Sequence, residues 1–228
     1  MHSLIADGYP IGSNHPYYNH FKYFNSVTPE NAGKWKLWIN PHNRQTYAQM
    51  REWFVAQGID NRGHGTVWET LNFGGAVPDV VLNETDTAKI RQIIKAHIID
   101  QVTELQQNVY ELDLVNEPVH ETYIAKTKLG WATSTEMAKE RALWHNWAKE
   151  AAPDLPLVVN EFAPLQYNDN FDVSFVAYVQ DLVANGADVA GIGLQGHFFE
   201  TIPTVQELQN DWLKSVSWAS RCVLPSST

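Results

Sequence analysis

The sequence predicts an α/β fold in which helices cover a parallel β-sheet. Short strand-like runs alternate with longer helical patterns, and each connection between runs is long enough to be a crossover rather than a hairpin. The expected strands cover residues 22–30, 60–69, 110–117, 155–162 and 188–197. Because no low-complexity linker or short-period repeat interrupts this alternation, residues 1–228 are expected to form one domain.

Three amphipathic patterns mark helices between these strands, over residues 87–105, 133–152 and 172–187. The first has isoleucines at positions 90, 93, 94 and 98, a spacing that lines one face of a helix. The second begins with Thr133 and Glu136, which are spaced as in a capping box. Gly186 ends the third, as glycine often does. These helices are the expected crossovers of the sheet.

Composition excludes several classes of function. The formal net charge of −10 and the pI near 5.3 oppose binding to nucleic acid, which is itself a polyanion. A single cysteine, Cys222, excludes an internal disulfide and a cysteine-based metal site. The histidines form no H-E-x-x-H pattern, so no metal is expected. The N-terminal residues lack the pattern of a signal peptide or membrane span, so no membrane partner is expected.

Polar and aromatic side chains gather where the expected strands end. In a β/α barrel, the C-terminal ends of the strands share one rim, and the chemistry takes place there. The residues at these ends are Glu30, Asn31, His64, Trp68, Asn116, Glu117, Asn160, Glu161, Gln195 and His197. Carboxylates, amides, imidazoles and an indole suit a neutral ligand that is rich in hydroxyl groups. The predicted class of ligand is therefore carbohydrate.

Four motifs occur in a characteristic order: NSVTPENAGKW (25–35), RGHGTVW (62–68), LDLVNEP (112–118) and GIGLQGH (191–197). Together they resemble the family 10 glycoside hydrolases, which are mostly endo-1,4-β-xylanases. The resemblance covers roughly residues 20–212. It implies the fold of that family, a TIM (β/α)8 barrel, of which about five of the eight βα units are recognisable in this chain.

The resemblance implies roles for four residues at the point of cleavage. Glu117, in the Asn-Glu-Pro motif, matches the general acid/base of the family. Asn116 would hold the 2-hydroxyl of the sugar next to the reacting carbon. Gln195 and His197 match a pair in which the histidine supports the nucleophile.

The resemblance also implies residues that bind the rest of the sugar chain. Glu30, Asn31 and Lys34 match positions that bind sugar units on the non-reducing side of the cut. His64 and Trp68 would flank the sugar at the cleavage point. The implied ligands are xylan or xylo-oligosaccharides, and no cofactor is implied.

The nucleophile of the reaction is not found in this sequence. Cleavage with retention needs two carboxyl groups about 5–5.5 Å apart, one as acid and one to attack the anomeric carbon. The family's nucleophile lies in a Thr-Glu-Leu-Asp-like motif on the next strand, and nothing similar follows His197. The sequence VTEL does occur at 102–105, but Glu104 is expected to be a solvated helix residue. Glu161 is a lesser candidate, because its strand is expected to neighbour that of Glu117.

We therefore expect a retaining endo-1,4-β-xylanase domain of which this chain is an incomplete copy. Residues 2–21 do not show the strand that begins the family's barrel, and the tail 213–228 is unlike the family. Five strands do not close a barrel, so self-association through open sheet edges is expected. The resemblance implies a secreted protein, although this chain shows no signal peptide.

Two alternative functions stay open. One is a non-catalytic xylan-binding remnant, which keeps the sugar contacts but lacks the nucleophile. The other is a β-glucanase on the same fold.

Overall fold

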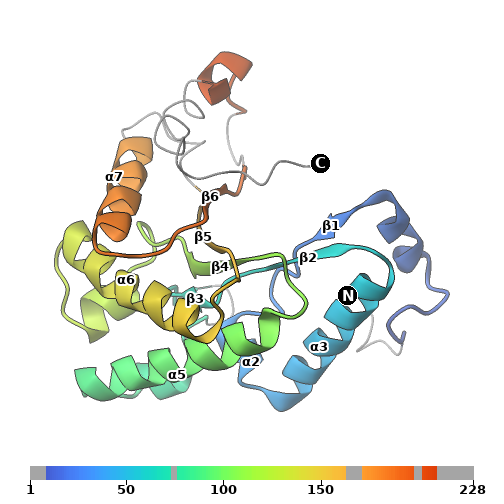
Figure 1. Cartoon of the computed structure of the whole chain (residues 1–228), viewed down its shortest axis with the longest axis horizontal. Coiled ribbons are helices and arrows are strands. Elements are labelled where there is room, and N and C mark those ends of the chain that lie inside the picture. Colours follow the sequence, from blue (N-terminus) through green and yellow to red (C-terminus); the bar gives the residue numbers. More distant parts are fainter. Residues whose placement is uncertain (1–8, 73–75, 163–170, 198–201, 210–228) are drawn as a thin grey trace.

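The computed structural model describes residues 9–72, 76–162, 171–197 and 202–209 of the chain. Its strands are β1 (Ser26–Val27), β2 (Asp60–Gly63), β3 (Val67–Trp68), β4 (Glu111–Asn116), β5 (Leu157–Glu161) and β6 (Gly191–Leu194). They form a parallel sheet in the order β1-β2-β4-β5-β6, with β3 also paired to β4 (Figure 1). The predicted parallel α/β architecture is confirmed. The sheet stays open in the described residues, because no pairing joins β1 to β6.

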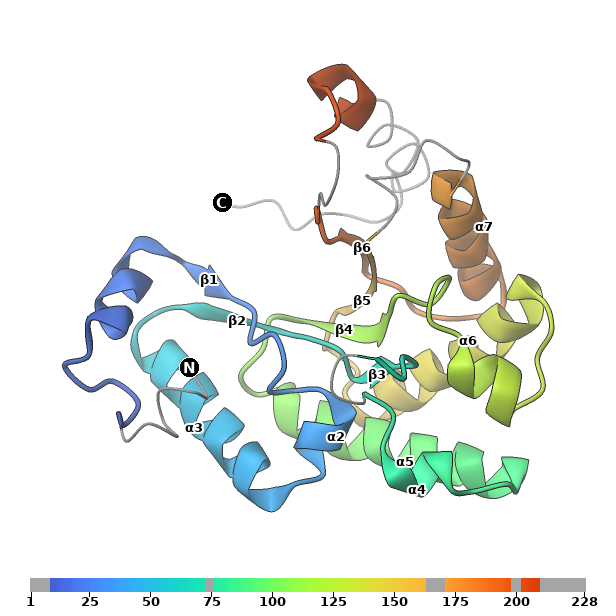
Figure 2. The same ribbon diagram turned by 180° about the vertical axis from the view of Figure 1, so that it is seen from behind.

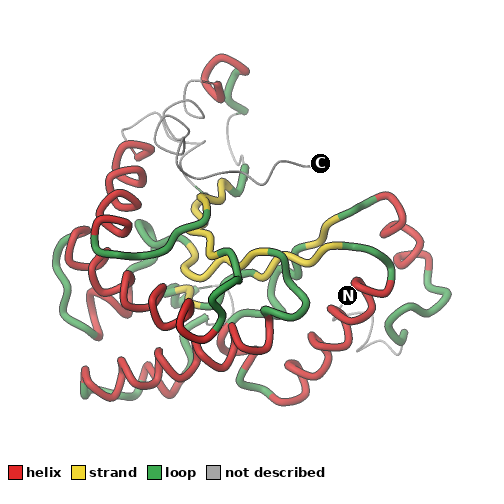
Figure 3. Tube along the Cα trace, viewed as in Figure 1, coloured by secondary structure: helices red, strands yellow, loops and turns green. Residues whose placement is uncertain are grey.

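Helices lie before the first strand and in all but one of the connections between strands in the described part of the chain. They are η1 (Pro16–Tyr23), α2 (Trp35–Trp38), α3 (Pro41–Ala56), α4 (Asp79–Leu82), α5 (Thr87–Leu105), η2 (Ile124–Lys128), α6 (Ser134–Ala151) and α7 (Phe171–Ala184). The helices α3, α5 and α6 lie along one side of the strands, as the views from the front and from behind show (Figures 1 and 2). The alternation of helix and strand along the trace is visible in Figure 3.

The three predicted helices are confirmed, and their ends form as the sequence indicates. α5 has the predicted bounds. Thr133 and Glu136 form both hydrogen bonds of a capping box at the start of α6. Gly186 follows α7 with a φ of 89°, a conformation in which glycine escapes the steric cost of a Cβ.

The main core lies between the helices and the sheet. Ile90, Ile94 and Ile98 of α5 are fully buried, in one apolar cluster with Leu112 and Leu114 of β4. Burying each such side chain stabilises the fold by about 1.5–3 kcal/mol. This packing holds β4 in place, and β4 leads directly into Glu117.

Three of the predicted strands are wrong in extent. Residues 188–197 contain only the four-residue β6. Residues 22–30 contain only the two-residue β1, because the preceding residues form η1 and Pro29 has no N–H to donate to a ladder. Residues 60–69 divide into β2 and β3. Gly65, with a φ of 72°, lies at the break between them. The predicted tail 213–228 lies outside the described residues.

Glu104 lies on a helix, as expected, and its side chain is 29% exposed, but it is ion-paired rather than free in solvent. Its carboxylate accepts hydrogen bonds from Arg51 Nη2 at 2.6 Å and Arg44 Nε at 2.7 Å. Both arginines are on α3, and the side chain of Arg51 is 2% exposed. Glu104 therefore joins α5 to α3 and takes no part in a site at the strand ends.

Candidate functional site

A cavity of about 560 Å³ lies at the C-terminal ends of the strands. It is lined by Glu30, Asn31, Lys34, His64, Trp68, Asn116, Glu117, Phe162, Gln195 and His197. All nine residues assigned to the site from the sequence thus lie around one cavity. Among the described residues, Phe162 is the one lining residue that the sequence reasoning missed, although its place directly after β5 follows the same rule of strand ends.

Three side-chain donors fix the carboxylate of Glu117. Trp68 Nε1 donates to Oε2 at 3.0 Å, while Asn116 Nδ2 and Gln195 Nε2 donate to Oε1 at 3.1 and 2.9 Å. These donors come from β3, β4 and the residue after β6, so three parts of the sheet rim converge on one group. Glu117 keeps 8% of its surface exposed and lines the cavity. The carboxylate is therefore held in one position and remains accessible to a ligand.

The backbone of Glu117 is strained. Its φ is 54°, and it is the one non-glycine residue with positive φ in the described part of the chain. Such a conformation costs of the order of 1–3 kcal/mol and persists where the surroundings enforce it. Here the N–H of Glu117 donates to Asn160 O at 2.7 Å, and its carbonyl accepts from the N–H of Glu121 at 2.7 Å. Backbone strain of this kind clusters at functional sites.

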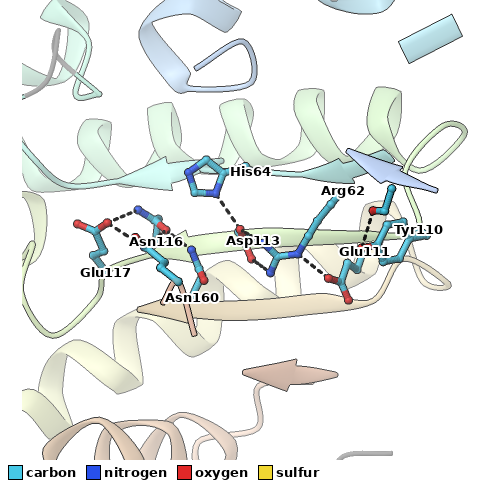
Figure 4. Close-up of polar contacts among 10 residues, drawn as sticks. Arg62, His64, Tyr110, Glu111, Asp113, Asn116, Glu117 and Asn160 are labelled. Carbon is cyan, nitrogen blue, oxygen red and sulfur yellow. Dashed lines mark hydrogen bonds and ion pairs between the residues drawn. The ribbon is translucent and has the colours of Figure 1, made fainter. Parts of the chain in front are cut away.

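A bulge in β4 places Asn116 on the face of the sheet that bears the site. The pairing with β5 shifts between Asp113 and Val115, so Asp113 and Asn116 pair with Val158 and Asn160 although they are three residues apart. Asn160 Nδ2 then donates to Asn116 Oδ1 at 2.8 Å (Figure 4). This bond orients the amide of Asn116, which in turn donates to Glu117.

Glycine at position 193 makes room for this arrangement. A Cβ on Gly193 of β6 would lie 2.5 Å from Asn160 Oδ1 and 3.0 Å from Arg62 Nη2. The contact with Asn160 is the prohibitive one, because real Cβ atoms essentially never lie closer than 3.0 Å to another heavy atom. The glycine-rich sequence of β6 therefore allows the polar side chains of β2 and β5 to lie close to the strand.

A partly buried polar network holds His64 at the edge of the cavity. His64 Nδ1 lies 2.8 Å from Asp113 Oδ2, and Arg62 binds the same carboxylate through Nη1 at 2.8 Å and Nη2 at 2.5 Å (Figure 4). The side chain of Asp113 is fully buried. Burial by itself would lower the pKa of Arg62, but Asp113 and Glu111 raise it above its usual value, so the guanidinium stays charged. Sequence reasoning missed Arg62 and Asp113, although both lie within the quoted motifs.

Lys34 lies against the aromatic wall of the cavity. Its Nζ is 4.3 Å from the centroid of the Trp68 ring and donates to Asn31 Oδ1 at 2.7 Å. Burial, the largest influence, lowers the pKa of Lys34, while the carboxylates of Glu30 and Glu117 act in the opposite direction. A cation beside an aromatic ring and an amide, within the electrostatic influence of two carboxylates, suits the binding of a polar, uncharged ligand.

The structure contradicts the suggestion that Glu161 replaces the missing nucleophile. Glu161 is fully buried, and its carboxylate lies 3.0 Å from His120 Nδ1 and accepts from the N–H of Phe162 at 2.9 Å. It does not line the cavity. The physical reason is the period of two in a strand: Asn160 points to the site, so its neighbour points away.

The described residues show neither a metal site nor a membrane-spanning helix. No group of three or more His, Cys, Asp or Glu side chains in them is arranged to hold a metal ion. None of the helices that the structure describes is long and apolar enough to cross a membrane.

Residues that follow separate strands of an open parallel sheet line one polar, aromatic cavity, and the sequence matches one family over most of its length. The chain belongs to glycosyl hydrolase family 10, whose model matches residues 10–220. This range is wider at both ends than the span of the four motifs.

Relatives and solved structures agree with this assignment. The chain is 30% identical over 179 residues to endo-1,4-beta-xylanase A of Phanerodontia chrysosporium, covering 77% of this chain and 42% of that protein. It is 27% identical to a beta-1,4-xylanase of Dictyoglomus thermophilum, covering 83% and 52%. Native xylanase10C from Cellvibrio japonicus superposes with a TM-score of 0.76 at 19% identity, over 90% of this chain and 44% of that one. That structural likeness bears on the fold alone. The chain spans about half the length of the curated relatives it matches.

Proposed function

We propose that the cavity binds the xylose units of xylan or xylo-oligosaccharides and that Glu117 is the general acid/base of an endo-1,4-β-xylanase site. One observation carries the proposal: a carboxylate at the edge of a cavity of about 560 Å³ is fixed by three N–H donors from separate strand ends. The names of the relatives support the choice of substrate, since they are xylanases. A solved xylanase from Cellvibrio japonicus with a similar fold is a complex with xylopentaose.

In the proposed reaction, Glu117 protonates the glycosidic oxygen as its bond to the anomeric carbon breaks. It later removes a proton from the water that releases the sugar. Asn116 would donate a hydrogen bond to the 2-hydroxyl without adding charge. The ring of Trp68 offers an apolar face for the sugar, while Asn31 and Lys34 bind the next unit on the non-reducing side.

A retaining reaction also needs a nucleophilic carboxylate about 5–5.5 Å from the acid, and we assign none in this chain. Glu161 is directed toward His120 rather than toward the cavity. We therefore propose turnover for a form of the protein that supplies this second carboxylate. For the 228 residues alone, we propose sugar binding without turnover, because no covalent intermediate can form. Non-catalytic xylan binding is thus the second candidate function.

Binding and turnover should be measured together on soluble xylan, mixed-linkage β-glucan and carboxymethyl cellulose. The chain is expected to bind xylan best and to release no reducing sugar beyond the background of a Glu117→Gln variant. Tighter binding to either glucan would replace the proposal with a β-glucanase site. Release of xylo-oligosaccharides by the purified monomer, abolished in that variant, would show that a nucleophile exists among these residues. Because xylan is a polymer, we also propose that the protein acts outside the cell.

A further inference from the structure

A fully buried ion pair lies beneath the segment that follows Glu117. Arg141 of α6 binds Glu69, the residue after β3, through Nη2 at 2.5 Å and Nε at 2.9 Å, both to Oε1. Neither side chain is exposed at all. The two residues are 72 positions apart in the sequence, so the pair forms only when α6 packs under the strand ends.

Both members of the pair also bind the backbone of this segment, residues 118–125. Arg141 Nη1 donates to the carbonyl of Pro118 at 2.8 Å, and Nη2 donates to the carbonyl of Glu121 at 3.2 Å. The second carboxylate oxygen of Glu69 accepts the N–H of Ala125 at 2.8 Å. The pair therefore fixes three points of the segment, the first of them directly after Glu117.

The same pair fixes the partner of Glu117 on the neighbouring strand. Glu69 follows Trp68, whose indole N–H donates to Glu117 Oε2 at 3.0 Å. Glu69 thus anchors the donor, Trp68, and Arg141 anchors the segment that follows the acceptor, Glu117. The strained φ of Glu117 needs such constraint, since a residue relaxes out of an unfavourable conformation unless its surroundings prevent it.

Stability alone does not account for a pair buried this deeply. The desolvation of two charges often exceeds their mutual attraction, and well-packed apolar residues of similar volume frequently stabilise a core as well or better. A guanidinium can, however, donate to a carboxylate and to two carbonyls at once in a fixed geometry, which no apolar side chain can do.

We propose that Glu69 and Arg141 are positioning residues, which set the place of the Glu117 carboxylate through the 118–125 segment and through Trp68. The consequence for sugar binding rests on the proposed function. The consequence for the Trp68–Glu117 hydrogen bond does not, because it is a property of the free protein.

The test uses a double variant, Glu69→Leu with Arg141→Met, which replaces the pair with apolar side chains. The matched control is Arg51→Met with Glu104→Leu, which removes another buried-arginine pair between α3 and α5 that lies away from the cavity. A single Arg141→Lys variant keeps the charge but not the three-way geometry. If the double variant does not fold, Arg141→Lys alone tests whether the pair positions Glu117.

Two readouts separate positioning from packing. In ¹⁵N-labelled wild-type protein, the indole N–H signal of Trp68, assigned with Trp68→Phe, reports the hydrogen bond to Glu117, and Glu117→Gln should move that signal. The double variant and Arg141→Lys should also move the signal from its wild-type position, while the control pair variant should leave it in place. Xylobiose affinity should fall about tenfold in the same two variants, the equivalent of one well-placed hydrogen bond.

The outcomes distinguish this inference from the proposed function. If wild-type protein does not bind xylobiose, the proposed function fails, while the position of the Trp68 indole signal still decides the role of the pair. If the folded double variant and Arg141→Lys both keep the wild-type position of this signal, the pair is a packing element and the inference is overturned. An equal change of the signal in the control pair variant would also overturn it, since the effect would then be general.

Discussion

Two buried histidines should make the stability of this protein depend steeply on pH below 7. His97 of α5 donates from Nε2 to the carbonyl of Thr66 at 2.9 Å and stacks on Trp35 with ring centroids 4.2 Å apart. His145 of α6 is fully buried, and its Nδ1 lies 2.9 Å from the carbonyl of Arg141. Within the described residues, its Nε2 has no hydrogen-bond partner. Protonation would place a charge in the core at either site.

Burial, the largest influence, lowers the pKa of His97 and of His145 from 6.5 to about 4. Below pH 6.5 the unfolded chain therefore binds protons that the folded chain does not, so stability present above pH 6.5 is lost as the pH falls toward 4. Between pH 7 and pH 5 each histidine should cost about 2 kcal/mol of unfolding free energy. The two together should cost about 4 kcal/mol, a large part of a typical total of roughly 5–15 kcal/mol.

Urea unfolding at pH 7 and at pH 5, at one low protein concentration, measures this loss. His97→Gln and His145→Gln should each reduce the difference between the two pH values by about 2 kcal/mol, whatever they do to stability at pH 7. His42→Gln is the matched control, because His42 is exposed at the start of α3. If either buried variant keeps the full wild-type difference, that histidine is not held neutral and the reasoning fails.

Three further predictions concern the site and the sheet. In a form of the protein that turns over xylan, Glu117→Gln should slow cleavage of unactivated substrates by about 10²–10⁴-fold and slow activated aryl glycosides less. Equal losses on both substrates in steady-state assays would remove Glu117 from the acid role. Asn31→Ala should weaken xylobiose binding by about 0.5–1.5 kcal/mol in calorimetry, more if the charge of Lys34 contributes to the lost contact. Unchanged affinity would make the motif structural. Size-exclusion chromatography of the isolated chain should show oligomers, because β1 and β6 form the edges of the sheet and have no further strand partner among the described residues. A monomer at all concentrations would contradict this.

The site could be predicted from the sequence because one physical rule places its residues together. Parallel strands end at a shared rim, so residues that follow separate strands, such as Trp68, Glu117 and Gln195, must lie close together once the sheet forms. Their residue types then indicate the chemistry. The same rule would have found Phe162, which directly follows β5.

Pairings between distant residues could not be predicted in this way. Nothing near Glu69 indicates that its partner is Arg141 on a later helix, and nothing in VTEL indicates that α3 brings Arg51 to Glu104. The orientation of Glu161 is a different case. Its strand pairs with the strand that leads into Glu117, but alternation of side chains turns Glu161 to the opposite face, where it meets His120.

Titration of ¹⁵N-labelled protein with xylobiose, followed through the tryptophan indole signals, tests the central claim most directly. The chain has nine tryptophans, of which Trp68 lines the cavity and Trp144 is fully buried beneath the sheet. Saturable movement of the Trp68 signal is predicted, with Trp144 unmoved and a weaker response to cellobiose. An unmoved Trp68 signal at saturating xylobiose, or equal movement of both signals, would contradict the claim that this cavity is a xylan-binding site.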